Sequence, residues 1–218
     1  KVNEKSLTHN FTNEGGVSGT YRFLKNIMGL WLVQQCRRSF ERDGSSYDYD
    51  QLTEMARGAK PLQMFIDPDA EVFLNPVDMP AAIQNFCRQT GQKVPESKAE
   101  LVRCCLESLA LKYRWTVEKL TEITNRSAQV IHMVGGGTQN QLLCQLTADA
   151  TGLPVVAGPI EATAVGNILM QAMALGEIGS IQEGRQLVRS SFPVQVYESQ
   201  AKEPWDDVYP RFAELVVN

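Results

Sequence analysis

Three consecutive glycines, Gly135-Gly136-Gly137, are the residues whose type and spacing point most directly to chemistry. They follow a short apolar run over residues 128–134 that is typical of a buried strand. A helix pattern comes next, and Thr138 and Gln141 stand three residues apart at its start, as in a capping box. The sequence therefore predicts free backbone N–H groups at the start of a helix, where a flat or anionic ligand can lie.

A second strand–glycine–helix unit follows the first. Residues 153–157 form another short apolar run, Gly158-Pro159 a turn, and residues 161–175 a helix that ends at Gly176. Two such units in tandem predict an α/β layer. The glycines alone leave open whether the turn contacts a ligand or only packs a helix on a strand. They are not a G-x-G-x-x-G fingerprint, so a dinucleotide fold is not favoured.

A long apolar helix is expected over residues 19–42. Asn26 and Gln34 are polar residues within it, about 12 Å apart along a helix axis and close to one face. Their amides could contact neighbouring parts of one ligand, or each could satisfy a nearby backbone group. The residues alone leave both alternatives open.

The composition is that of an ordinary globular protein. The chain has 218 residues, 43% hydrophobic and 21% charged, with a formal net charge of −4. A net negative charge does not favour binding to nucleic acid or to an anionic membrane. The apolar runs are too short to span a bilayer. We therefore expect neither partner, and we expect a cytoplasmic protein. The five cysteines form no C-x-x-C, which with only two histidines argues against a zinc site.

Caps, prolines and apolar spacing predict the remaining elements. A long scaffold helix should begin at the capping box of Ser97 and Glu100, with Lys112 on a face exposed to solvent together with Arg114, Lys119 and Arg126. The other expected helices and strands cover residues 49–60, 80–89, 181–190 and 205–217 (helices) and residues 64–66 and 194–197 (strands). No linker or repeat interrupts the chain, so residues 1–218 are expected to form one domain.

Three stretches resemble a known family: residues 12–34 (TNEGGVSGTYRFLKNIMGLWLVQ), 133–140 (MVGGGTQN) and 156–167 (VAGPIEATAVGN). They are similar to the rhamnulokinases within the FGGY sugar kinases. The resemblance implies an actin-like ATPase fold of the ribonuclease H type, an α/β fold with two lobes and with ATP and sugar in the cleft. It implies transfer of phosphate from ATP to position 1 of L-rhamnulose, with Mg²⁺.

The resemblance also implies roles for single residues. Asn26 matches an amide that contacts the ketose, and Gln34 one that contacts ATP. Gly136 matches the glycine against which the nucleotide lies. The neighbours expected to line the adenosine pocket are Gly135, Gly137 and Asn140.

Two parts that the family uses for phosphoryl transfer have no match in this chain. They are a glycine loop that contains Asp, and an Asp-Thr motif with the catalytic base. We therefore expect no catalytic residue and no metal ligand here, and a C-terminal lobe that is inactive without its own N-terminal domain. Cys87 and Cys104 match a pair that can be bridged in similar kinases. An exposed apolar surface is expected where the upstream strands would join.

Other functions remain open from the sequence. L-Fuculose or L-xylulose is the near alternative as acceptor, because the residues that contact most of the sugar are expected in the other lobe. A non-catalytic actin-like domain that binds nucleotide for regulation or assembly is an alternative of a different class. A structural α/β domain without ligand is the third.

Overall fold

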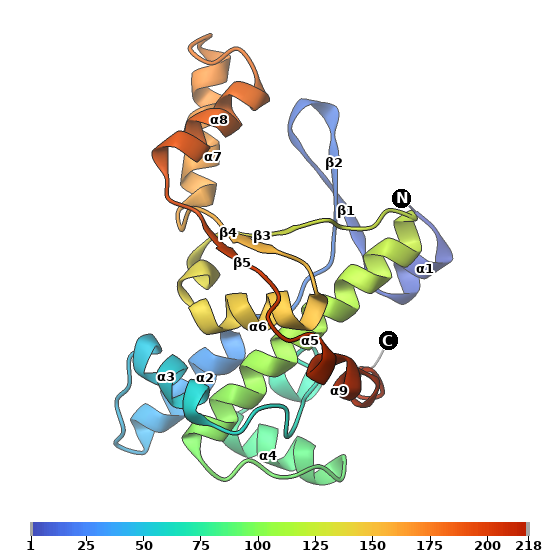
Figure 1. Cartoon of the computed structure of the whole chain (residues 1–218), viewed down its shortest axis with the longest axis vertical. Coiled ribbons are helices and arrows are strands. Elements are labelled where there is room, and N and C mark those ends of the chain that lie inside the picture. Colours follow the sequence, from blue (N-terminus) through green and yellow to red (C-terminus); the bar gives the residue numbers. More distant parts are fainter. Residues whose placement is uncertain (1, 217–218) are drawn as a thin grey trace.

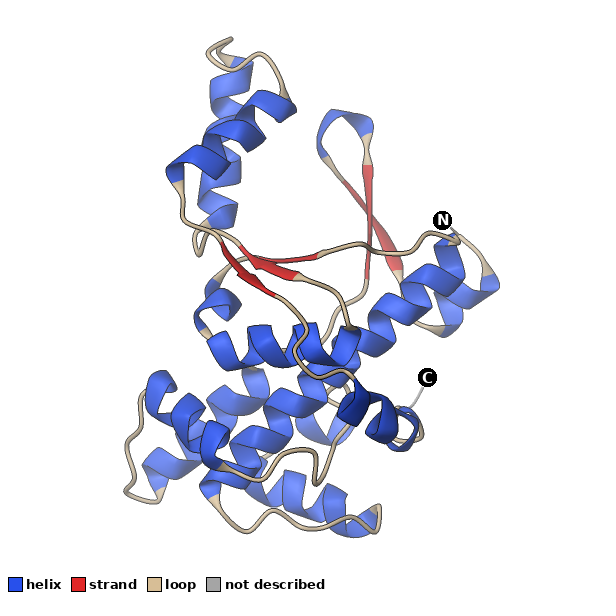
Figure 2. Ribbon diagram, in the orientation of Figure 1, coloured by secondary structure: helices blue, strands red, loops and turns tan. Residues whose placement is uncertain are grey.

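Helices make up most of the computed structural model, which describes residues 2–216 (Figure 1, Figure 2). They are α1 (Glu4–Thr8), α2 (Trp31–Arg42), α3 (Tyr49–Gly58), α4 (Met79–Gln89), α5 (Lys98–Thr124), α6 (Gln141–Thr151), α7 (Ala162–Ala174), α8 (Ile181–Ser191) and α9 (Glu203–Ala213). Short 3₁₀ turns cover Val17–Gly19, Glu71–Phe73 and Gly136–Gln139. No helix within residues 2–216 has both the length and the apolar content needed to cross a bilayer.

The strands form two separate sheets. An antiparallel hairpin joins β1 (Thr12–Gly15) to β2 (Tyr21–Leu24). In the second sheet β3 (Ile131–Met133) runs parallel to β4 (Val155–Ala157), and β5 (Gln195–Tyr197) runs antiparallel to β4. Figure 1 shows α6 on one side of this short sheet, with α7 and α8 extending from the other. The two strand–glycine–helix units are thus neighbours, and the predicted α/β layer is confirmed.

The long helix α5 is the centre of the core. It begins at the predicted capping box: Ser97 Oγ accepts a hydrogen bond from the N–H of Glu100 at 3.2 Å, and Glu100 Oε2 accepts one from the N–H of Ser97 at 3.2 Å. It ends at Asn125, whose φ of 56° lies in the left-handed region. Along its length α5 packs against α2, α3, α6 and α9. Four other helices are therefore positioned relative to this one.

Several other predicted elements are confirmed. The helices expected over residues 49–60, 80–89 and 181–190 are α3, α4 and α8, and the last expected strand is β5. Pro80 lies in the first turn of α4, as predicted. The closing helix α9 ends earlier than expected, at Ala213, and residue 217 lies outside the described residues.

The helix predicted over residues 19–42 is wrong in its first half. Residues 21–24 pair with β1 as strand β2, and helix α2 begins only at Trp31. Gly29 between them has φ +64°, a left-handed conformation that interrupts a right-handed helix. Asn26 lies in the irregular segment before α2 and Gln34 lies in α2, and both are exposed. The expected spacing of the two amides along one helix therefore does not hold.

The strand predicted over residues 64–66 is also wrong, although all three residues are buried. Side chains supply the hydrogen bonds that a neighbouring strand would supply. Ser108 Oγ accepts from the N–H of Ile66 at 3.0 Å. The amide of Gln92 bonds both backbone groups of Phe65, at 2.9 and 2.8 Å. The segment is a buried loop.

The sequence predicted Lys112 on a solvent-exposed face, and this prediction is wrong. Lys112 is buried, with 1% of its surface exposed. Its Nζ lies 2.7 Å from Asp67 Oδ1 and 3.2 Å from Asp69 Oδ2. A buried ammonium is tolerated when opposite charges surround it. Partners more than 40 residues away in the chain therefore decide where this lysine lies.

All five cysteines are buried and none forms a disulfide. The Cys87 thiol is hydrogen-bonded to the Cys104 thiol. This hydrogen bond and the burial of Cys104 raise the pKa of Cys104 well above its usual value. The two thiols thus lie close together, as in the pair that the resemblance implied.

Apolar side chains are exposed on the elements farthest from the helical core. They include Ile168 on α7 and Val196 on β5, at 65% and 52% exposure, and α7 has no buried residue. That upstream strands would cover them stays a prediction.

The start of α5 predicts a pH-dependent stability. Hydrogen bonds from Lys93 and from the N–H of Glu96 lower the pKa of Glu100 from 4.5 to about 2. Because the folded pKa lies below the unfolded one, the carboxylate stabilises the fold above pH 4.5, and this contribution is lost as the pH falls towards 2. We expect Glu100→Gln to unfold at a lower temperature than the wild type at pH 7, and the difference to shrink below pH 4.5. A difference that stays constant in thermal unfolding from pH 7 to pH 2 would contradict this assignment.

Candidate functional site

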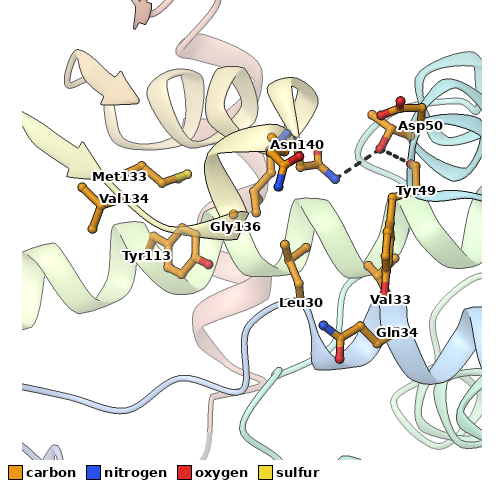
Figure 3. A pocket seen from close by; sticks show the side chains of 14 residues that line it. Leu30, Val33, Gln34, Tyr49, Asp50, Tyr113, Met133, Val134, Gly136 and Asn140 are labelled. Carbon is orange, nitrogen blue, oxygen red and sulfur yellow. Dashed lines mark hydrogen bonds between the residues drawn. The ribbon is translucent and has the colours of Figure 1, made fainter. Parts of the chain in front are cut away.

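A cavity of about 540 Å³ lies where α2, α3 and α5 meet the turn that follows β3 (Figure 3). It opens at the carboxyl end of β3, the side of an α/β sheet where ligands usually bind. Its lining comes from five parts of the chain: Leu30, Val33, Gln34, Tyr49, Asp50, Thr53, Tyr113, Met133, Val134, Gly136, Gly137, Gln139, Asn140 and Leu143.

The glycine turn differs from the predicted capping box. A 3₁₀ turn follows Gly135, and α6 begins only after Asn140, whose Oδ1 accepts a hydrogen bond from the N–H of Leu143 at 2.9 Å. Thr138, expected as the cap, instead donates its hydroxyl to the carbonyl of Gly135 at 2.8 Å. The predicted capping box is wrong because the extra 3₁₀ turn moves the N-cap of the helix by two residues, from Thr138 to Asn140.

The three glycines have different tasks. Gly135 has φ +82°, which a residue with a side chain rarely adopts, and it adjoins the cavity without lining it. Gly136 and Gly137 line the cavity, and a Cβ added to either would meet no atom within 4 Å. The backbone therefore borders open space here, which leaves room for a ligand to lie against it.

Asn140 lines the cavity but is already engaged in the fold. Its Oδ1 caps α6, and its Nδ2 donates to Thr53 Oγ1 on α3 at 3.3 Å. The Thr53 hydroxyl donates in turn to the carbonyl of Tyr49 at 2.8 Å. The bond between Asn140 and Thr53 thus ties the start of α6 to α3 beside the cavity.

Gln34 lies in the first turns of α2 and lines the cavity with an exposed side chain. Thus Gln34, Gly136, Gly137 and Asn140, four of the residues predicted from the sequence, lie around one cavity. Asn26 does not line it.

Aromatic and acidic residues that the sequence did not single out complete the cavity. Tyr113, expected only in the apolar stripe of α5, contributes a phenol whose pKa burial raises to about 12. It therefore stays protonated and uncharged near neutral pH. Tyr49 and Asp50 come from the start of α3. No spacing rule links positions this far apart in the chain, so only the packing of α3 and α6 on α5 brings them together.

The charge of the lining limits what the cavity can hold. Among the described residues that line it, Asp50 carries the only carboxylate and none is Lys or Arg. A phosphate group would meet no opposite charge here. The cavity suits a flat, uncharged, partly polar group such as a nucleobase with its sugar.

Comparison with known proteins decides the family. Residues 1–175 match the sequence model of the C-terminal domain of the FGGY family of carbohydrate kinases. The chain belongs to this family. It is 46% identical over 207 residues to a rhamnulokinase of Bacteroides thetaiotaomicron, which covers 95% of this chain and 42% of the relative. It is 44% identical to a rhamnulokinase of Bacillus subtilis, covering 90% of this chain and 40% of the relative. The chain thus spans about two-fifths of the length of these relatives.

Solved structures of sugar kinases show the same fold. A xylulose kinase from Rhodospirillum rubrum matches 94% of this chain and 41% of its own, with a TM-score of 0.66 at 20% identity. A glycerol kinase from Plasmodium falciparum, solved with ADP, matches 91% of this chain and 39% of its own, with a TM-score of 0.61 at 14% identity. The predicted α/β fold, that of a C-terminal domain of the FGGY sugar kinases, is confirmed.

Alanine substitutions at Gly135 and Gly137 should distinguish a glycine required for its backbone conformation from one that only borders open space. Gly135→Ala forces a side chain into the left-handed region, and we expect a loss of about 1–2 kcal/mol in the free energy of unfolding. Gly137→Ala places its methyl group in empty space, and we expect a change within about 0.5 kcal/mol. Urea denaturation of both variants measures the difference, and equal losses would contradict the distinction.

Proposed function

We propose that this chain is the nucleotide-holding C-terminal lobe of a kinase that transfers a phosphate from ATP to L-rhamnulose, giving L-rhamnulose 1-phosphate in L-rhamnose catabolism. One observation carries the proposal: bare glycine backbone at Gly136 and Gly137 faces the cavity that Gln34 also lines. The similarity to rhamnulokinases over at least nine-tenths of the chain supports it.

The cavity fits the adenosine part of ATP. Its volume of about 540 Å³ lies within the range of small-molecule sites. Apolar and aromatic walls, including Leu30, Tyr49 and Tyr113, can cover the faces of a base, and the amide of Gln34 can donate and accept hydrogen bonds. We propose that Gly136 and Gly137 lie against the nucleotide, that Gly135 shapes the turn, and that Asn140 forms part of the wall.

The phosphates and Mg²⁺ need other residues. When bound with the nucleotide, Mg²⁺ would supply positive charge that offsets the negative charge of the phosphates during phosphoryl transfer. Within residues 2–216, no group of three His, Cys, Asp or Glu side chains could hold a metal ion, and the cavity is lined by no cation. We therefore place the phosphate contacts, the metal ligands and the catalytic base in an N-terminal lobe of the same protein. We place the reaction in the cytoplasm, where ATP is available.

Asn26 is the proposed contact to the ketose. It is exposed on the segment that leads from β2 to Leu30, which lines the cavity. An amide can donate to one sugar hydroxyl and accept from another. The ketose would thus lie beside the nucleotide, near the start of α2. Residues 1–218 are proposed to act as one domain, since α9 packs on α5 and α6.

Ketose selectivity tests the function. We expect the protein, joined to its N-terminal lobe, to phosphorylate L-rhamnulose in the presence of ATP and Mg²⁺ faster than L-fuculose, L-xylulose or glycerol. Residues 1–218 alone should give no product, because the base is absent. Phosphate transfer to none of these acceptors would contradict the kinase proposal and favour a nucleotide-binding module, and a preference for L-fuculose would change the substrate.

A side chain at Gly136 tests the nucleotide site. Gly136→Val fills the space beside the backbone, and we expect the KM for ATP to rise about tenfold or more, the effect of ~1.4 kcal/mol, with the KM for the ketose nearly unchanged. Gly58→Val is the matched control, since Gly58 also has open space around it and lies outside the cavity. An unchanged KM for ATP in Gly136→Val would place the nucleotide elsewhere.

A further inference from the structure

The segment that carries Asn26 is fixed by a buried ion-pair network. Lys112 Nζ on α5 lies 2.7 Å from Asp67 Oδ1 and 3.2 Å from Asp69 Oδ2. The other oxygen of Asp69, Oδ1, accepts a hydrogen bond from the N–H of Met28 at 2.9 Å. Met28 is two residues after Asn26. A continuous path of polar contacts therefore leads from the core helix to the segment before α2.

Burial makes this network rigid. The side chains of Lys112 and Asp67 are each 2% exposed, and that of Asp69 is 24% exposed. Asp67 Oδ1 also accepts from the N–H of Asp69 at 3.2 Å, which holds the two acids in one turn. An ammonium buried this deeply is costly unless its acidic partners stay in place. Asp69 therefore has little freedom to move, and the backbone of Met28 is held with it.

A second contact holds the same segment on the other side of Asn26. Lys25 Nζ donates to the carbonyl of His9 at 3.0 Å and lies 5.6 Å from the centre of the Trp115 ring. Between the two contacts the side chain of Asn26 is exposed, and it has no hydrogen-bond partner among residues 2–216. Among the backbone groups of residues 25–29, only the N–H of Met28 forms a hydrogen bond within the described part of the chain, and its acceptor is Asp69. The segment is thus anchored while its amide remains available.

We propose that Asp69, held by Lys112, is a positioning residue that places Asn26 for contact with the ketose. This inference rests on the proposed function. It assigns a role in sugar binding to Asp69 and Lys112, neither of which lines the cavity. Holding a binding amide in place before the ligand arrives lowers the ordering cost of binding.

Steady-state kinetics of the two-lobed protein tests the inference. Asp69→Ala removes the acceptor for the Met28 N–H, and we expect the KM for L-rhamnulose to rise about tenfold with the KM for ATP within about twofold. Asp69→Asn keeps an oxygen that can accept this bond, so its KM should stay near that of the wild type. In an Asn26→Ala background, Asp69→Ala should add little, because both changes remove one interaction.

A matched control separates positioning from stability. Ser108→Ala removes a buried hydrogen bond to the N–H of Ile66, which adjoins Asp67, and among the described residues Ser108 makes no hydrogen bond to residues 25–30. We expect it to lower the unfolding temperature and leave the KM for L-rhamnulose unchanged. Asp69→Ser shortens the side chain and keeps a polar group near Lys112, so the test does not depend on the alanine variant folding.

Hydrogen exchange of the Met28 amide gives a readout that needs no activity. We expect faster exchange in Asp69→Ala than in the wild type and Ser108→Ala. Unchanged exchange would overturn the anchor. Faster exchange with an unchanged KM for L-rhamnulose, or fully additive effects with Asn26→Ala, would overturn the positioning role while the kinase function stands. If the wild-type protein phosphorylates no ketose, the proposed function fails and the sugar role with it, and exchange still decides the anchor.

Discussion

Lys112 is buried in the middle of α5, and the arrangement of this lobe depends on the ion pairs of its ammonium group with Asp67 and Asp69. It fixes the loop of Asp67 and Asp69 against the core helix, and through Asp69 it fixes the backbone before α2. Because removing one partner from a buried pair leaves an uncompensated charge, this contact allows few alternative packings of the loop. Helix α2 begins three residues after Met28 and packs on α4 and α5.

The cavity has two kinds of lining: helices joined by side-chain hydrogen bonds, and a glycine turn whose backbone is exposed to the cavity. Hydrogen bonds through Asn140 and Thr53 tie α3 to α6, so the walls are set before a ligand arrives. The glycine turn leaves the floor without side chains. Neither part carries positive charge, which is why we assign the nucleoside to this lobe and the phosphates to another. A sugar kinase divided in this way can act only when its lobes come together around both substrates.

The sequence predicted best what local signals determine. The capping box at Ser97 and the proline at position 80 gave correct helix starts, and the glycine turn gave the location of the cavity. The sequence-based predictions failed where contacts with residues distant in the chain, or the backbone angle of a single residue, determine the local structure. Nothing local shows that Gly29 is left-handed, or that Lys112 meets two acids more than 40 residues away. The roles proposed for Gln34 and Gly136 came from resemblance to a family, since spacing alone could not join two segments about 100 residues apart.

A crystal structure of the protein with a non-hydrolysable ATP analogue and Mg²⁺ tests the central claim most directly. The account predicts the adenosine in the cavity between α3 and the turn after β3, in contact with Gly136 and Gln34, with the triphosphate leading away towards the other lobe. An analogue bound elsewhere, or with its phosphates inside the cavity beside Asp50, would contradict the account.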